Sequence, residues 1–280
     1  MPTRLSTYKR ANNPLRIRRF KYYIPLLDLI EKYRFINSKQ IIALSQSNRG
    51  NTYTKLKKLF HNNFIDRYFL PSFKKKESIV YTLTIRGVET LRQLHPDRFR
   101  KIYYPKRKRS FLFVLHSLMI SNFHGTLELA LSQKNSCLTK WYQEKEVIKK
   151  FSKLQNIRLI PDSYFVIQTK QDEQHYFLEA DRGTMTLTRF YEKIRRYRKF
   201  FQTNRKDLPS RFRVLILATT PKRAENLRTV TITGDPQGKG SERFLFLNET
   251  QFSLENPDKL LKSICTVGLK GKEKLESLLQ

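Results

Sequence analysis

The chain has 280 residues, 39% hydrophobic and 12% aromatic, which is enough to bury a core and form two domains of ordinary size. Its 56 Lys and Arg against 24 Asp and Glu leave a formal net charge of +32, and this excess predicts a polyanionic partner because self-repulsion opposes compaction. No apolar run has the roughly 18 to 20 residues of a membrane-spanning helix, and the basic N-terminus lacks an export signal. Two distant cysteines, Cys137 and Cys265, suggest neither a zinc site nor a disulfide framework, so we expect a cytoplasmic protein. Phosphate backbone is the favoured polyanion, with an anionic membrane and ribosomal RNA as alternatives.

Residues 1–21 are basic and polar, without an acid or an apolar period, and predict a flexible arm. The arm either lies along a phosphate backbone or serves as a solubilising tail. From Pro25, apolar residues at helical spacing predict a first helix ending near Phe35.

Ser38 is an expected N-cap for a short second helix, and a polar run from Ser45 to Asn51 ends it. The apolar spacing through Tyr53 and Phe60 predicts a third helix. Two β-prone runs, residues 64–70 and 78–83, flank a basic tip and predict a hairpin. Thr84 is expected to cap the helix that follows.

Three short helices and a basic-tipped hairpin indicate a winged helix-turn-helix over residues 22–97. In that arrangement the third helix enters the major groove and the hairpin tip meets the backbone. The alternative is a protein interaction module whose basic residues form a solvated face. The residues expected to face DNA on the third helix and the wing are Asn51, Thr52, Thr54, Lys55, Lys58, Lys74, Lys75 and Lys76.

Residues 98–110 form a basic linker between the domains, and its Arg107 and Arg109 are expected to contact DNA. The second predicted domain spans residues 111–280 and begins with a long, mostly apolar helix over residues 111–132. Its two histidines, His116 and His124, are more typical of packing than of catalysis.

Acidic residues are scarce in this chain, yet three fall near one predicted hairpin, formed by strand-like runs at residues 157–167 and 175–181. Alternation places Glu179 and Asp181 on the same face, about 7 Å apart at roughly 3.4 Å per residue. Pairing of the two runs brings Asp162 close to Glu179. Oxygen ligands of this kind suit Mg²⁺ or Mn²⁺. The alternative is that the acids only solvate the strand ends.

The helix after Gly183 has an apolar stripe and a basic outer face, on which Arg189 and Arg196 are expected to bind nucleic acid. Lys193 lies at the edge of the stripe, about 90° from its centre. It either leans over the sheet toward the carboxylates or is a surface lysine. Two further apolar runs, residues 213–220 and 243–249, predict the remaining strands of an αβ sheet.

The order of these motifs resembles the replication-relaxation family of plasmid and mobile-element proteins, from about Arg18 to Thr220. The most specific part is the Pro-Asp pair ending at Asp162, followed by E-x-D-R-G-T from Glu179. The family pattern falls on His116, Trp141, Glu144, Asp162, Glu179, Asp181, Arg182, Gly183, Thr184, Lys193 and Tyr197.

The resemblance implies a second domain similar to the PD-(D/E)XK nucleases, an α+β or α/β fold in which acids on two strands and a lysine hold a metal and act on DNA. This chain departs from that pattern because Asp181 stands at the lysine position, and Lys193 is the expected replacement. The implied catalytic residues are Asp162, Glu179, Asp181 and Lys193, and the implied Mg²⁺ or Mn²⁺ ligands are Asp162, Glu179, Asp181 and Glu144.

Two functions therefore follow from the sequence. In the first, the protein binds double-stranded DNA of a plasmid or mobile element in replication, relaxation or mobilisation and nicks it with a divalent metal. In the second, it is a non-enzymatic regulator or accessory factor whose second domain forms a homodimer or docks replication or transfer proteins. An RNA-binding nucleoprotein is supported by charge alone.

Overall fold

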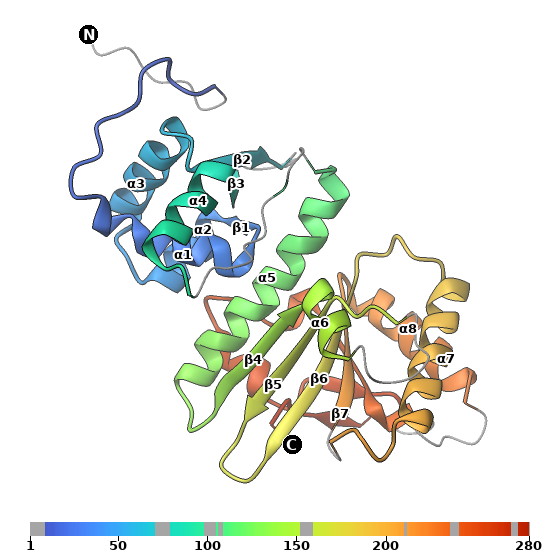
Figure 1. The fold of residues 1–280 in the computed structure, drawn as a ribbon. Coiled ribbons are helices and arrows are strands. Elements are labelled where there is room, and N and C mark those ends of the chain that lie inside the picture. Colours follow the sequence, from blue (N-terminus) through green and yellow to red (C-terminus); the bar gives the residue numbers. More distant parts are fainter. Residues whose placement is uncertain are drawn as a thin grey trace. The chain divides into compact units, whose positions relative to one another are not determined.

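The computed structural model describes residues 9–70, 79–97, 105, 109–151, 159–209, 212–235, 241–269 and 274–279 (Figure 1). Its contacts divide the chain into two compact units, residues 1–125 and 126–280. Each unit has its own sheet, and each is considered by itself below. The fold is the mixture of α and β structure that the sequence predicted.

The helices of the first unit follow the predicted order: α1 (Ile24–Tyr33), α2 (Ser38–Ser45), α3 (Arg49–His61) and α4 (Ile85–Leu94). Helix α2 is capped by Asn37 and not by Ser38, since the Asn37 side chain accepts from the Gln40 amide and the Gln40 side chain accepts from the Asn37 amide. Asn48 caps α3, so this helix begins inside the polar run that was expected to be a break.

The first sheet has three strands in the order β1 (Ile36–Asn37), β3 (Ile79–Leu83) and β2 (Ile65–Phe69), all antiparallel. Strands β2 and β3 form the predicted hairpin, with Ile65 opposite Leu83. Thr84 caps α4 as expected, through a bond from the Gly87 amide. The hairpin tip with Lys74, Lys75 and Lys76 lies outside the described residues.

A large apolar core joins the helices and strands of the first unit. Its fully buried members include Leu27, Ile30, Ile41, Leu56, Leu59, Val88 and Leu91. Gly87 permits α4 to approach β2, because a Cβ there would lie 2.2 Å from the carbonyl oxygen of Phe64.

Residues 9–20 correct the prediction of a free N-terminal arm. Arg10 bonds to Asp66 at 2.6 Å, the Ala11 amide donates to His61 Nδ1 at 2.9 Å, and Asn62 donates to the Leu15 carbonyl at 2.9 Å. Ile17 and Phe20 also pack against the core. The segment therefore passes along the C-terminal end of α3, and only residues 1–8 lie outside the described structure.

Helix α5 (Phe111–Ser132) has the predicted bounds, but the division between the units falls within it, after Gly125. Val114 and Leu118 pack with Phe35 of the first unit, and Ser121 Oγ donates to the Tyr33 carbonyl at 2.9 Å. The predicted boundary before residue 111 is therefore too early, because the first turns of α5 complete the core of the first unit.

The sheet of the second unit has seven strands in the order β10-β9-β8-β7-β6-β5-β4. Strands β6, β7 and β8 are parallel to one another, and the outer pairs are antiparallel. The strand bounds are Cys137–Gln143 for β4, Ser163–Gln168 for β5, Glu173–Asp181 for β6, Phe212–Ala218 for β7, Phe244–Asn248 for β8, Cys265–Val267 for β9 and Leu275–Glu276 for β10.

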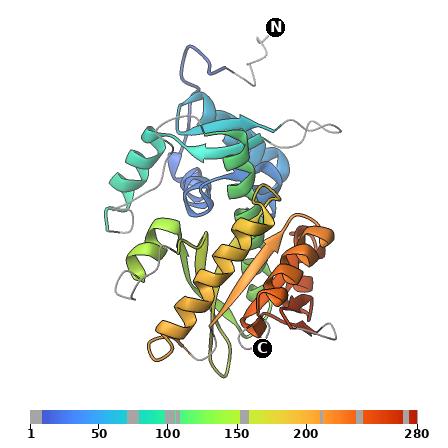
Figure 2. The same ribbon diagram turned by 90° about the vertical axis from the view of Figure 1, so that its right-hand side faces the viewer.

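Helices α7 (Leu187–Thr203) and α8 (Pro221–Thr233) lie side by side on one face of this sheet (Figure 2), and α6 (Glu144–Lys150) follows β4. Alternate residues of the strands face α7 and α8 and form the main core of the unit, such as Phe177, Val214 and Ile216. Glu179 and Asp181 belong to the same alternation as Phe177. The packing therefore carries two acids of β6 into the layer between the sheet and the helices.

Candidate functional site

Strands β5 and β6 bring two acids together as the sequence predicted. Ser163 is opposite Leu178 in the antiparallel register, and the Asp162 amide donates to the Leu178 carbonyl at 3.1 Å. The Ala180 amide donates to Asp162 Oδ2 at 2.8 Å. The Asp162 carboxylate is therefore held against the peptide that follows Glu179.

Glu179 is buried, with 5% of its surface exposed, and both of its oxygens have a partner on α7. Lys193 Nζ donates to Oε2, and Tyr197 donates its hydroxyl hydrogen to Oε1. Thr186 caps α7 and sets where the helix begins, and the i, i+4 spacing of Lys193 and Tyr197 brings both over Glu179. Lys193 thus reaches the carboxylates and is not the surface lysine that was the alternative.

Asp162, Glu179, Lys193 and Tyr197 form a cluster in which the protonation of each group affects the others. Burial raises the pKa of Glu179 to about 7, with the Lys193 ammonium opposing the rise and Asp162 adding to it. Burial lowers the pKa of Lys193, but Glu179, Asp162 and Asp181 outweigh that effect and raise it. Burial also raises the pKa of Tyr197, so this residue is a neutral hydrogen-bond donor.

Asp181 has a different set of partners and does not join the Lys193 ammonium. Arg223 of α8 donates from Nε to Oδ1 at 2.8 Å and from Nη2 to Oδ2 at 3.0 Å, a bidentate pair. The Gly183 amide donates to Oδ1 at 2.7 Å, and Arg223 Nη2 also donates to the Met185 carbonyl at 2.6 Å. Asp181 and Arg223 therefore hold the loop between β6 and α7, where Gly183 has a φ of 79°.

Arg223 was missed by the sequence reasoning. The sequence feature that could have revealed Arg223 is the helix start at Thr220-Pro221, directly after the buried run of β7. Since β6 and β7 are parallel, with Asp181 opposite Ala218, the first turn of α8 falls beside Asp181.

The four predicted metal ligands are not gathered into one group. Glu144 is exposed at the start of α6, and Asp181 is paired with Arg223. Within the part of the chain that the structure describes, no three His, Cys, Asp or Glu side chains lie close enough to share a metal ion. Because Lys193 pairs with Glu179, Arg223 pairs with Asp181 and Glu144 is exposed on α6, the four acids as arranged do not form one Mg²⁺ or Mn²⁺ site.

A cavity of about 600 Å³ opens beside this cluster. Its lining combines cations with apolar side chains and one acid, namely Leu159, Ile160, Thr184, Met185, Arg189, Glu192, Lys193 and Arg196. Arg189, Lys193 and Arg196 follow one another at i, i+4 and i+7 along α7, so they form one stripe. We call this cavity the α7 pocket.

Of the five residues of α3 predicted to face DNA, two are exposed, two are half-buried and one is buried. Asn51 and Thr54 are exposed, whereas Lys55 and Lys58 are half-buried at the edges of that face. Thr52 is a correction: only 1% of it is exposed, and its hydroxyl donates to the Asn48 carbonyl at 3.0 Å. The residue that was missed is Lys57, which follows Thr54 by three residues and is exposed.

The basic linker is described only in part. Arg109 is exposed, its amide donates to Tyr68 Oη at 3.2 Å, and its guanidinium lies 5.1 Å from the centre of the Phe113 ring. Arg107, like the wing lysines, lies outside the described residues.

The remaining positions of the family pattern have structural partners. Trp141 stacks on Phe165 with ring centres 5.4 Å apart, and Arg182 lies 4.0 Å from Glu249. Thr184 lines the α7 pocket, and His116 is half-buried on α5. No helix in the described part of the chain combines the length and apolar composition that crossing a membrane requires.

These features define a class: a two-unit αβ protein with a strongly basic surface and a buried acid-lysine cluster between the sheet and helix α7 of its second unit. The chain belongs to the replication-relaxation family, whose model matches residues 27–212.

Comparisons with curated proteins and with solved structures do not extend this family assignment. A comparison with curated proteins gave no match. A solved structure of the restriction endonuclease FokI bound to DNA is similar at 13% identity and a TM-score of 0.23, covering 75% of this chain and 41% of that one. This chain therefore spans less than half the length of that protein, and a likeness at this TM-score supports no assignment of fold or activity.

Proposed function

We propose that this protein binds double-stranded DNA of a plasmid or mobile element and acts in its replication or relaxation. Membership of the replication-relaxation family supports the biological role, and the net charge of +32 supports a phosphate-rich partner. The first unit serves as a winged helix, in which α3 enters the major groove and the β2–β3 tip contacts the backbone.

The observation that carries this proposal is the solvent face of α3. Gly50, Thr54 and Lys57 recur at i, i+4 and i+7, with Asn51 and Lys58 beside them, and all but the half-buried Lys58 are exposed. The opposite side of the helix, including Leu56 and Leu59, is buried in the core. Lys57 and Lys58 have no acidic partner among the described residues, so their charges are available to phosphates.

Binding to a duplex is expected to depend steeply on salt. Each phosphate contact contributes a slope of roughly −0.9 in log K against log salt, so several contacts give a slope steeper than about −3. Fluorescence anisotropy of a labelled duplex between low and moderate salt measures it. A slope near zero would contradict the proposal, and an equal affinity for RNA of the same length would favour the nucleoprotein alternative.

A second candidate function is nicking of that DNA with a divalent metal, in a fold similar to the PD-(D/E)XK nucleases. The observation that favours it is the meeting of Asp162, Glu179 and Lys193 from two adjacent strands and the next helix. Against it stands the absence of a third acid in that cluster among the described residues.

Nicking of supercoiled plasmid with and without Mn²⁺ tests this candidate. If the cluster is catalytic, Glu179→Gln is expected to lower the rate at least about 100-fold, since it removes a charge on which a metal site depends. Glu255→Gln, at an exposed acid outside the cluster, is the control and should nick like the parent.

The melting temperature gives an independent readout, because a metal that binds the folded state raises it by mass action. If the parent shows neither nicking nor a rise with Mn²⁺, the second unit instead serves dimerisation or docks replication or transfer proteins.

A further inference from the structure

The α7 pocket is lined by two chemically different sets of side chains. Arg189 and Arg196 are exposed on α7, about 10 Å apart along the helix axis at 1.5 Å per residue. Leu159, Ile160 and Met185, from the segments before β5 and before α7, form its apolar wall, and 47% of the Ile160 surface is exposed. A ligand that satisfies both sets must carry negative charge and also a flat or apolar part.

The other charged side chains of the pocket, Lys193 and Glu192, further limit the class of ligand. Lys193 is held by Glu179, so it contributes positive charge at the pocket wall while its ammonium stays paired. Glu192 is an exposed acid in the same lining and repels a densely charged ligand. The lining thus suits one or two phosphates spaced by an organic group, and not a compact polyphosphate.

The size of the cavity also favours a ligand with an organic part. About 600 Å³ falls within the range of roughly 300 to 1,000 Å³ found for pockets that enclose a small organic molecule. A single phosphate would leave most of the apolar wall uncovered. A base inside a duplex is stacked and paired, and reaches such a pocket only after it leaves the stack.

We propose that the α7 pocket binds an unpaired nucleotide of single-stranded DNA, with its backbone phosphates on Arg189 and Arg196 and its base against Leu159, Ile160 and Met185. This inference rests on the proposed function in that both take DNA as the ligand, but the site and the form of DNA differ. The first unit reads the duplex, and the second holds a strand that has been opened. Basic side chains that follow the backbone and apolar surface for the bases are the usual means of binding single strands.

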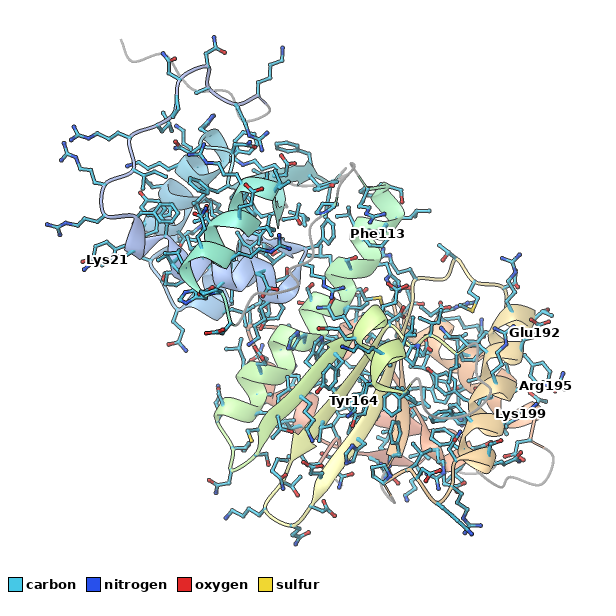
Figure 3. The ribbon with its side chains drawn as sticks, in the orientation of Figure 1. Lys21, Phe113, Tyr164, Glu192, Arg195 and Lys199 are labelled. Atoms are coloured by element: carbon cyan, nitrogen blue, oxygen red, sulfur yellow. The ribbon has the colours of Figure 1, made fainter. Side chains whose placement is uncertain are left out.

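Helix α7 supplies a matched pair of variants for the test. Arg189→Ala with Arg196→Ala removes two charges from the pocket. Arg195→Ala with Lys199→Ala removes two charges from the same helix (Figure 3). Neither residue lines the pocket. All four side chains are exposed, so both double variants are expected to fold.

Affinity of the full chain is measured for a labelled oligothymidylate and, separately, for a duplex. The pocket variant is expected to bind the single strand about tenfold more weakly or worse, the control within about threefold of the parent, and both should keep the duplex affinity within about threefold. Equal losses in the two variants would overturn the pocket. A parent that binds neither DNA would overturn the proposed function too, whereas strong duplex binding with unchanged single-strand affinity in all variants overturns only this inference.

The base is followed by 2-aminopurine placed in the oligonucleotide, because its emission depends on stacking. Parent protein is expected to change the emission, and Ile160→Asn should abolish the change by removing the exposed apolar wall. Ile148→Asn, at an equally exposed apolar side chain of α6, is the control and should leave the change intact. No change in the parent, or the same loss in both variants, would overturn the placement of the base.

Discussion

Reversing the charges of Lys57 and Lys58 is expected to weaken duplex binding by roughly 100-fold or more. Each substitution to Glu removes an attraction to phosphate and adds a repulsion, and like charges juxtaposed at an interface cost several kcal/mol. Lys57 is exposed on the solvent side of α3 and Lys58 is half-buried at its edge, while Leu56 and Leu59 hold the buried side. The fold should therefore survive, which circular dichroism and the melting temperature check.

The matched control reverses Lys21 and Arg92 in the same unit. Both are exposed and lie outside α3, and the change in net charge is identical. Its affinity is expected to stay within about threefold of the parent. If the two double variants lost affinity equally, binding would follow from net charge alone and α3 would not be the recognition helix. A partial effect of Lys55→Glu is expected, since Lys55 lies at the edge of that face.

Replacing Lys193 with Met is expected to lower the free energy of unfolding by about 3 to 5 kcal/mol at pH 8, because it leaves the buried Glu179 carboxylate without its cation. The loss should be smaller at pH 5.5. Burial raises the pKa of Glu179 from 4.5 to about 7, so at pH 5.5 the carboxyl group is protonated and needs no cation.

The sign of the pH dependence follows from the same shift. A carboxyl group whose pKa is higher in the folded state than in the unfolded state stabilises the protein most below pH 4.5, and this contribution is lost as the pH rises through about 7. Glu179→Gln is expected to remove this contribution, and adding it to Lys193→Met should recover much of the lost stability. Urea unfolding of the four proteins at pH 5.5 and pH 8 measures these effects.

Lys199→Met is the control, since Lys199 is exposed on the same helix (Figure 3). It should change the unfolding free energy by less than about 0.5 kcal/mol at either pH. A Lys193→Met variant as stable as this control at pH 8 would mean that the Lys193–Glu179 pair does not form.

Local pattern determined which elements form. Helical spacing of apolar residues predicted α1, α3 and α7, because this period reports which side of a helix is buried. Two strand-like runs separated by a polar turn predicted the β5–β6 hairpin. The hairpin in turn brought Asp162 to Glu179, since an antiparallel register fixes which residues are neighbours. The position of Lys193 at the edge of the apolar stripe was also predictable. The sequence left open whether its side chain reaches the carboxylates or lies in solvent.

Tertiary structure decided the contacts between segments that are distant in the chain. Arg223 bonds to Asp181 across 42 residues of sequence, and Asn62 bonds to Leu15 across 47. The spacing of apolar residues within one segment gives no information about such pairs. Thr52 shows the same limit, since it is polar and was expected to face DNA, yet it is buried. Helix α5 was predicted to the residue, but the packing of Val114 and Leu118 assigned its first turns to the first unit. Local sequence sets which faces are apolar, and the folded chain alone sets which polar groups are enclosed with them and what they pair with.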